Sequence, residues 1–417
     1  MKFGLLGRKL SHSYSPEIQN YLGSSPYTLF EVEPDKVGSF LRKSDFTGLN
    51  VTMPYKKDVI PFLDDLSDTA RKLGSVNTII RTPNNILIGH NTDYYGFSYL
   101  LGRMTDNVAG QKILVLGSGG ASNTVVAVLR EKGANPVVIS RTGENHYENL
   151  YLHSDAVAIV NTTPVGMYPH TGTSPVDLSC FPHLIWVLDI IYNPAKTKLL
   201  LDAESHGIPC ENGLRMLIAQ AKESAEWFLD KKISDSIIEN IYKKISVEMK
   251  NIILIGMPGC GKTTIAKKLS EITNRKSIDL DQIICEAEGC SIPEIFQTGG
   301  EKVFRAVETK AIDKICKKSG LIIATGGGCV TVPENIPLLR QNGILFWIQR
   351  DLEKLPIHGR PLSLAKTPKQ LYLERKELYQ ACADYIIDNN DDDLSEAIEQ
   401  IQQILEDGHE DLSFKRT

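Results

Sequence analysis

The chain has 417 residues, of which 42% are hydrophobic and 23% charged, and its formal net charge is -5. This length exceeds one ordinary hydrophobic core and predicts two or three domains, with the composition of a globular protein. The mild acidity argues against a nucleic-acid-binding protein, which normally carries a basic face. Apolar runs such as "HLIWVLDII" are too short to span a membrane, and the N-terminus lacks a signal-peptide core.

The eight cysteines are scattered without CxxC pairs, and no histidine follows Cys285 and Cys290 at metal-ligand spacing. We therefore expect reduced thiols instead of disulfides or a metal site, and a cytoplasmic location. The expected partners are small-molecule substrates, with no nucleic acid and no membrane. The protein would be a monomer or a homo-oligomer.

Short apolar strands alternate with amphipathic helices along the whole chain, which favours an α/β architecture with parallel sheets. Residues 1 to about 100 form one predicted lobe. The stretch "QKILVLGSGGASNTVVAVLREKG" then predicts a strand, a tight turn and a helix, and "NPVVISRT" predicts the next strand. This βαβ unit begins near residue 111 and predicts a second, Rossmann-like lobe.

The turn "GSGGAS" is a variant of the glycine-rich phosphate-binding turn. Gly117 gives the turn, Gly119 allows close approach, and the helix N-terminus attracts a pyrophosphate. The next strand ends in Ser140, Arg141 and Thr142, where an NAD-binding fold usually has an acidic residue. A cation there suits a 2′-phosphate, so NADP is preferred over NAD. The alternative is an arginine that merely extends from a strand end.

A domain boundary is predicted at 243–250, "KKISVEMK", after the helical pattern that begins near Asn212 and before the strand "NIILIGM". The loop that follows, "GMPGCGKT", fits GxxxxGK[ST] at every fixed position. Its glycines let backbone N–H groups turn towards phosphate oxygens. Lys262 would meet the β- and γ-phosphates of a nucleotide, and Thr263 would ligate Mg²⁺.

Two carboxylates follow in "KSIDLDQII". Asp279 and Asp281 stand two apart on a strand-like segment, so their side chains are predicted to share one face. One carboxylate could serve a metal ion and the other a substrate hydroxyl. A solvated acidic strand end is the alternative.

The P-loop, "IFQTGGEKVFRAVE", "IIATGGGCV", "HGRPLS" and "YLERKELY" occur in this order and closely resemble shikimate kinase over residues 250–405. The resemblance implies that Asp279 lies near magnesium, that Asp281 orients or deprotonates the attacking hydroxyl, and that Arg360 reaches the phosphates from a mobile lid. Surface salt bridges are the alternative for Arg305 and Arg375. The residues implied to hold shikimate are Asp281, Arg305, Gly326, Gly327, Gly328 and Arg375. Those implied to bind ATP are Gly256, Gly259, Cys260, Gly261, Lys262, Thr263 and Thr264, with Thr263 and Asp279 at the metal.

The stretches "SHSYSP", "GLNVTMPYK", "LGSVNTI", "GHNTDYYGF", "GSGGAS", "SRT", "NTTPVGM" and "NGLRMLIAQ" together resemble shikimate dehydrogenase over residues 1 to about 240. The resemblance implies that Lys56 and Asp93 form the catalytic pair. Lys56 can donate the proton that a ketone oxygen needs after hydride transfer, and Asp93 can hold the ammonium group. The other residues implied to surround the substrate are Ser13, Ser15, Asn50, Thr52, Asn77 and Gln220. Those implied to bind the cofactor are Gly117, Gly119, Gly120, Ala121, Ser122, Ser140, Arg141, Thr142, Asn161, Thr162, Met167, Gly213 and Met216.

Several polar residues near these motifs keep two interpretations. Ser13 and Ser15 could together bind a carboxylate, or they could form a loop or N-cap before Pro16. His12 and His90 are interpreted as packing or hydrogen-bonding residues and not as bases.

Two positions depart from the dehydrogenase pattern. Asn145 stands where the family often has a further arginine, which weakens the NADP preference. Arg215 replaces a small residue in "NGLRM" and could alter closure around the cofactor. The last residues, "EDGHEDLSFKRT", lack apolar periodicity and predict a frayed tail.

The sequence thus predicts a dehydrogenase-like part at 1–248, with a substrate lobe at 1–100 plus about 213–245 and an NADP-binding lobe at 101–212. A kinase-like P-loop domain with a parallel sheet follows at 249–417. The predicted function is NADPH-dependent reduction of 3-dehydroshikimate to shikimate, then phosphorylation to shikimate 3-phosphate with ATP and Mg²⁺. The alternatives are a non-catalytic regulator that binds nucleotide and metabolite, and a dehydrogenase half that uses quinate.

Overall fold

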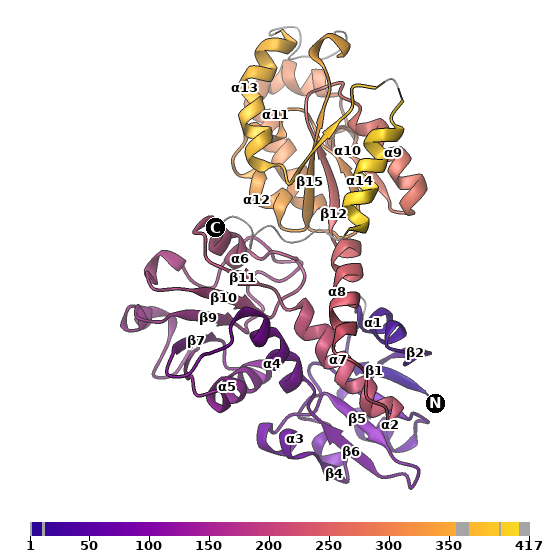
Figure 1. Cartoon of the computed structure of the whole chain (residues 1–417), viewed down its shortest axis with the longest axis vertical. Coiled ribbons are helices and arrows are strands. Elements are labelled where there is room, and N and C mark those ends of the chain that lie inside the picture. The colour runs from indigo at the N-terminus through magenta and orange to yellow at the C-terminus, as the bar shows by residue number, and fades with distance from the viewer. Residues whose placement is uncertain (1, 11–12, 356–366, 392, 408–417) are drawn as a thin grey trace.

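Three sheets follow one another along the chain in the computed structural model, which describes residues 2–10, 13–355, 367–391 and 393–407 (Figure 1). Helices lie around each sheet, so the predicted α/β architecture is confirmed. His12, Arg360 and the tail from residue 408, on which three predictions rest, lie outside the described residues. No disulfide joins any of the eight cysteines, all of which the structure describes. Among the described helices, none combines the length and the apolar character that a membrane crossing requires.

The first sheet is mixed. Its strand order is β2 (Tyr27–Glu31), β1 (Phe3–Gly7), β3 (Gly48–Val51), β5 (Thr78–Arg81), β6 (Leu87–His90) and β4 (Asp65–Leu66). β1 pairs in parallel with β2 and β3, whereas β5 is antiparallel to both β3 and β6. The prediction of parallel sheets is wrong here, because residues 82–86 alone join β5 to β6 and so short a connection permits a hairpin but no helical crossover. The helices of this lobe are α1 (Ser15–Tyr21), α2 (Val37–Lys43) and α3 (Asp68–Leu73).

The second sheet is parallel throughout. Its strand order is β11 (Cys210–Glu211), β10 (Trp186–Asp189), β9 (Ala158–Asn161), β7 (Lys112–Leu116) and β8 (Asn135–Ile139). Its helices are α4 (Asp93–Met104), α5 (Gly120–Glu131) and α6 (Lys198–Ser205). β7, α5 and β8 form the βαβ unit that the sequence predicts from residue 111, and the central strands are buried on both faces.

The third sheet is also parallel and contains the P-loop. Its strand order is β13 (Ser277–Asp279), β14 (Ile322–Ala324), β12 (Asn251–Ile255), β15 (Gly343–Gln349) and β16 (Tyr385–Asp388). Its helices are α9 (Lys262–Thr273), α10 (Leu280–Glu288), α11 (Ile292–Cys316), α12 (Asn335–Arg340), α13 (Pro368–Cys382) and α14 (Ser395–Glu406). The P-loop joins the end of buried β12 to the start of α9, as predicted.

Two long helices connect these parts. α7 (Leu214–Leu229) packs against α4 and also against α1, β3 and β5, so the chain returns to the first lobe after the second sheet. α8 (Ser236–Met249) packs on α7 and runs up to the third sheet (Figure 1). Lys250 alone separates α8 from β12, and the Arg275 guanidinium donates to the carbonyls of Val247 and Lys250, both at 2.8 Å. The predicted boundary at 243–250 thus falls on the last turns of a helix.

Candidate active sites

A lysine–carboxylate pair joins the segment after β3 to the start of α4. Lys56 Nζ is 2.6 Å from Asp93 Oδ2, and the exposed fractions of the two side chains are 27% and 13%. Lys56 follows β3 in the chain, and Asp93 begins α4. The pair is sheltered but remains accessible to a ligand, which is what a proton donor in a cleft requires.

Asn77 links this pair to α7. Its Nδ2 lies 3.0 Å from Asp93 Oδ1, 2.9 Å from Thr92 Oγ1 and 3.3 Å from Gln220 Oε1, and its Oδ1 accepts the Thr92 N–H at 2.7 Å. Lys56, Asn77, Asp93 and Gln220, which come from four separate sequence motifs, are therefore brought together. We call these four residues the Lys56 cluster.

Asn50 lies beside the Lys56 cluster but is buried. Its Oδ1 accepts from Tyr27 Oη at 2.7 Å and from Gln19 Nε2 at 3.3 Å, and its Nδ2 donates to Thr78 Oγ1 at 3.1 Å. Both ends of the Asn50 amide thus have hydrogen-bond partners within the protein, and these bonds hold β3 against β5. Contact between Asn50 and a substrate stays a prediction. Thr52 is half-buried just beyond the end of β3.

Ser13 and Ser15 lie half-buried at the start of α1. Ser13 Oγ accepts the Ser15 N–H at 3.2 Å, which is the local turn expected of the loop or N-cap interpretation. Among the described residues, no hydrogen bond joins either serine to the Lys56 cluster. Carboxylate binding by this pair stays a prediction.

The glycine-rich turn leaves open space at the N-terminus of α5. Gly117 has a φ of 104°, and a Cβ there would lie 2.9 Å from Thr162 Oγ1, so the turn requires glycine. A Cβ at Gly119 or Gly120 would meet nothing within 4 Å among the described residues. Packing does not explain these two glycines, whereas the approach of a pyrophosphate to the first N–H groups of α5 does. Ala121 and Ser122 complete the first turn of that helix.

Arg141 is exposed just beyond the end of β8, between Ser140 and Thr142. Asn145, which stands where the family often has another arginine, is held by His153, whose Nε2 lies 3.0 Å from Asn145 Oδ1. Contact of Arg141 with a 2′-phosphate stays a prediction.

The remaining cofactor candidates lie around the ends of β9 and β10. Asn161 is buried and its Nδ2 donates to Asp189 Oδ1 at 3.0 Å, while Thr162 Oγ1 donates to the Leu116 carbonyl at 2.7 Å. Gly213 precedes α7, and a Cβ there would lie 1.9 Å from the Ile190 carbonyl oxygen, so only glycine allows this approach. Met216 is buried and Met167 is exposed.

Arg215 is held by side chains of β11 and α8. Its guanidinium donates to Glu239 of α8 at 3.0 Å and to Glu211, and it stacks on the Tyr242 ring at 3.5 Å. The prediction that it alters cofactor closure gains no support from this placement.

A cavity of about 520 Å³ lies beside the P-loop. The predicted residues that line it are Gly259, Gly261, Lys262, Thr263, Thr264, Asp279, Asp281, Arg305, Gly326, Gly327, Gly328 and Arg375. Gly256 and Cys260 support the loop from behind: a Cβ on Gly256 would lie 2.5 Å from the Ile348 carbonyl oxygen, and Cys260 is fully buried. The sequence did not single out Asn389, whose Nδ2 donates to the Cys260 carbonyl at 2.7 Å.

The P-loop has the backbone of a phosphate cradle. Gly256, Gly259 and Gly261 have φ values of 140°, 85° and 100°, which glycine alone adopts readily. Lys262 Nζ donates to the carbonyls of Gly256 and Met257, both at 2.9 Å, so its ammonium group lies inside the loop.

Two side-chain oxygens lie together at the predicted metal position. Thr263 Oγ1 donates to Asp279 Oδ2 at 2.7 Å. Among the described residues there is no cluster of three His, Cys, Asp or Glu side chains that could hold a metal ion. Two protein oxygens fit Mg²⁺, which takes its other ligands from phosphates and water.

The predicted shared strand face of Asp279 and Asp281 is wrong. β13 ends at Asp279, whose Oδ1 accepts the N–H groups of Asp281 at 3.0 Å and Gln282 at 3.4 Å as the N-cap of α10. Asp281 therefore lies in the first helical turn. Both carboxylates nevertheless line the cavity.

Two arginines line the other side of this cavity. Arg305 Nη1 donates to Glu308 at 2.7 Å, and a Cβ on Gly328 would lie 2.2 Å from the Arg305 guanidinium. Arg375 is buried and donates to the Gly327 carbonyl at 3.1 Å, so a surface salt bridge is the wrong interpretation for it. Its Nε has no hydrogen-bond partner among the described residues, which suits an anionic ligand.

Known proteins resemble both parts of the chain. A family model described as shikimate dehydrogenase substrate binding domain matches residues 5–79, and one described as shikimate kinase matches residues 258–406. The shikimate dehydrogenase (NADP(+)) of Clostridium beijerinckii is 35% identical over 273 residues, which cover 60% of this chain and 99% of that protein. The chain belongs to the shikimate dehydrogenase family.

Solved structures also resemble this part of the chain. Shikimate dehydrogenase 1 from Peptoclostridium difficile is 36% identical with a TM-score of 0.54, covering 59% of this chain and 98% of that one. The quinate dehydrogenase from Corynebacterium glutamicum, solved with NAD, is 27% identical with a TM-score of 0.52, covering 58% of this chain and 99% of that one. With a shikimate kinase domain also matched, the predicted fusion of a shikimate dehydrogenase and a shikimate kinase is confirmed.

Proposed function

We propose that the chain reduces 3-dehydroshikimate to shikimate with NADPH and then phosphorylates shikimate to shikimate 3-phosphate with ATP and Mg²⁺. The supporting observation is the Lys56–Asp93 pair at 2.6 Å in the dehydrogenase family fold. The kinase family match over the P-loop cavity supports the second step. The proposed parts are a dehydrogenase at 1–248, with its substrate lobe at 1–100 and about 213–245, and a kinase at 249–417. We place this enzyme of aromatic amino acid biosynthesis in the cytoplasm.

In the first reaction, bound NADPH supplies the hydride. The Lys56 ammonium group donates a proton to the oxygen that was the ketone. Asp93 holds that ammonium group and offers its second oxygen to a ring hydroxyl, while Asn77 keeps Asp93 in position. Arg141 would bind the 2′-phosphate that distinguishes NADPH from NADH.

In the second reaction, bound ATP supplies the phosphoryl group. Asp281 orients the acceptor hydroxyl and takes its proton, while Arg305 and Arg375 bind the acceptor carboxylate. Thr263 and Asp279 hold Mg²⁺. The lid arginine predicted for the phosphates lies outside the described residues.

Lys56→Ala and Lys262→Ala provide the direct test. Each loses a charged group that only one site uses, so we expect about a 10²-fold or larger fall in one activity with the other spared. Steady-state assays of the purified chain for reduction and for phosphorylation measure both. Loss of both activities from a single folded variant would contradict two independent sites.

Quinate is a second candidate for the first substrate, because a quinate dehydrogenase has the same fold at 27% identity. Assays with shikimate and quinate, each with NADP and NAD, separate the two. A higher kcat/KM for quinate would select the alternative, and no turnover with any pair would favour a non-catalytic regulator.

A further inference from the structure

A turn of the kinase part contacts a loop of the dehydrogenase part. The Ala195 N–H donates to Asn342 Oδ1 at 2.7 Å, and the Lys196 N–H donates to the Gln341 carbonyl at 2.8 Å. Gln341 and Asn342 join α12 to β15, and Asn342 is 2% exposed. We call residues 193–197 the docking loop. Two of its backbone donors thus bond to the kinase.

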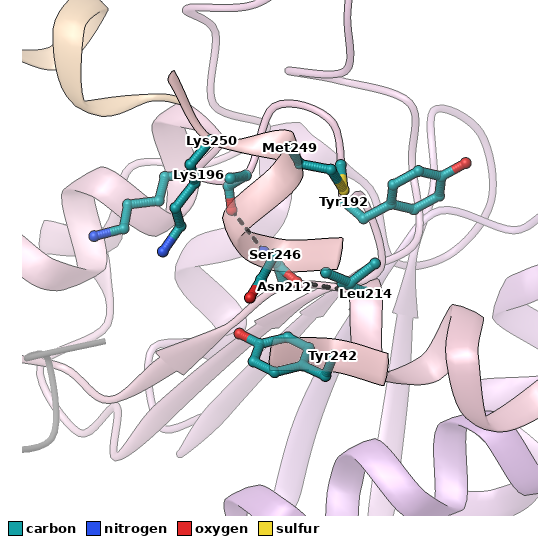
Figure 2. A pocket seen from close by; sticks show the side chains of 9 residues that line it. Tyr192, Lys196, Asn212, Leu214, Tyr242, Ser246, Met249 and Lys250 are labelled. Atoms are coloured by element: carbon teal, nitrogen blue, oxygen red, sulfur yellow. Dashed lines mark hydrogen bonds between the residues drawn. The ribbon is translucent and has the colours of Figure 1, made fainter. Parts of the chain in front are cut away.

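The docking loop also holds the start of α7. Asn212 Nδ2 donates to the Ala195 carbonyl at 2.8 Å, and its Oδ1 accepts the N–H of Leu214, the first residue of α7, at 2.9 Å. Figure 2 shows Asn212 beside Leu214 and close to Ser246 of α8. The cavity there is about 20 Å³, which leaves room for about one water molecule, so this junction is closely packed. Gly213, a predicted cofactor contact, lies between Asn212 and Leu214.

A second branch of hydrogen bonds begins at Asn193. The Tyr168 N–H donates to the Asn193 carbonyl at 3.0 Å. Tyr168 is the neighbour of Met167, which is another predicted cofactor contact. The docking loop therefore restrains the segment that carries Met167.

A third branch leaves the docking loop at its other end. Thr197 Oγ1 donates to Asp189 Oδ2 at 2.7 Å, and Asp189 Oδ1 accepts from Asn161 Nδ2 at 3.0 Å. Asn161 is a third predicted cofactor contact. Three of the positions that the resemblance assigns to the cofactor are thus connected, each through one intervening residue, to a loop that the kinase holds.

We propose that Asn342 of the kinase is a positioning residue for NADP(H) binding by the dehydrogenase. Its side-chain oxygen fixes the docking loop, and the docking loop sets Asn161, Met167 and Gly213 in their places. The inference rests on the proposed NADP(H) site and extends it, because it makes the cofactor affinity of one enzyme depend on a side chain of the other. A loop that is already ordered in the free protein does not have to lose conformational entropy when the ligand binds, which favours a higher affinity.

Asn342→Ala tests this inference, with Gln341→Ala as the matched control. Each removes one amide from the same turn, but Gln341 contacts the docking loop through its backbone carbonyl, and its side chain bonds to Leu338 within the kinase at 3.0 Å. One lost hydrogen bond predicts about a three- to tenfold rise in the NADPH dissociation constant for Asn342→Ala, and no rise for the control. The KM for NADPH should rise in parallel, while kcat and the KM for 3-dehydroshikimate stay within about twofold.

Hydrogen exchange gives a measurement that needs no cofactor. In the protein without NADPH, Asn342→Ala should speed exchange at the Ala195 and Lys196 amides, and Gln341→Ala should not. Equal effects of the two variants on exchange and on NADPH binding, or no effect of Asn342→Ala on either, would overturn the inference. If the wild-type chain itself bound no NADPH, the proposed function would fail and the inference with it, whereas wild-type binding with equal effects of the two variants would overturn the inference alone.

Asn342→Ala also removes bonds to the carbonyls of Cys316 at 3.3 Å and Lys317 at 3.1 Å, which could loosen the kinase. Asn212→Ala interrupts the same series of bonds from the dehydrogenase side. It should raise the NADPH dissociation constant by a similar factor, and the double variant should be less impaired than the product of the two single effects. A double variant in which the two effects multiply fully would also overturn the inference.

Discussion

A histidine stacks on a tryptophan behind the Lys56 cluster. The rings of His90 and Trp227 lie 3.8 Å apart between centroids, and His90 is 6% exposed. Burial lowers the pKa of His90 to about 4. The imidazole is therefore neutral at pH 7, which supports the interpretation of His90 as a packing residue.

His90→Phe keeps an aromatic ring against Trp227 and removes the titrating group. The unfolded chain protonates His90 near pH 6.5, but the folded chain does so only near pH 4, so stability falls as the pH falls through this window. Between pH 7 and pH 5 we expect the wild-type chain to lose about 2 kcal/mol more unfolding free energy than the variant. Urea unfolding followed by fluorescence at both pH values measures this, and identical pH dependence of the two proteins would contradict it.

Some residues of the two sites could be predicted from the sequence, and others could not. Lys56, Asn77 and Asp93 stand in separate polar motifs, and the structure brings them within hydrogen-bonding distance of one another. Glu308, which binds Arg305 inside the kinase cavity, was not singled out. Its spacing of three residues from Arg305 on a helix was the available signal. The buried position of Asn50 could not be foreseen, because it depends on partners from α1 and β2.

Among the secondary-structure elements, α10 is capped by a carboxylate, that of Asp279, which has two roles. Asp279 caps the helix with one oxygen and meets Thr263 with the other. Asp279→Asn should keep the cap but weaken Mg²⁺ binding, whereas Asp279→Ala should lose both. We expect both variants to need about tenfold more Mg²⁺ for half-maximal kinase activity, and only the alanine variant to lose about 1 kcal/mol of stability.

Magnesium titration of the kinase rate, together with thermal unfolding of each variant, measures the two roles separately. If Asp279→Asn were as unstable as Asp279→Ala, the capping role would be wrong. An unchanged magnesium requirement in both would remove Asp279 from the metal site.

The elements that local patterns describe were predicted, and those that depend on distant partners were not. The units β7–α5–β8 and β12–α9 each join a buried strand to a helix through a glycine turn, which a short window of sequence contains. The end of β13 is an exception, because it was missed although a local signal decides it: Asp279 caps α10 through the N–H groups of Asp281 and Gln282. The antiparallel pairing of β5 was missed because strand direction depends on the neighbours that the fold supplies.

For the whole molecule, the last turn of α8 brings two carboxyl groups together. Glu248 bonds to Glu17 of α1, beside Tyr14, whose hydroxyl bonds to Ser319 of the kinase. Burial first, and then the contact with Glu248, raise the pKa of Glu17 to about 7. Glu17 therefore keeps its proton below neutrality, and its repulsion with Glu248 grows as that proton is lost.

Glu248→Gln should relieve this repulsion. The folded pKa of Glu17 is above the unfolded value, so the stability that its proton contributes is lost as the pH rises from about 4.5 through about 7. We expect the variant to gain in unfolding midpoint relative to wild type at pH 8.5, and to gain less at pH 5.5. Urea unfolding at the two pH values checks this, and an equal difference at both would show that Glu17 does not titrate in this range.

Because a single residue separates α8 from β12, the connection between the dehydrogenase and the kinase is rigid. An inserted residue in an α-helix turns whatever follows by about 100° and moves it by about 1.5 Å. Lengthening α8 by one residue would therefore move Asn342 away from Ala195, because only Lys250 separates that helix from the first strand of the kinase. The helix therefore fixes the orientation of the two enzymes relative to each other. An insertion or deletion at this point would change that orientation even if both domains still folded.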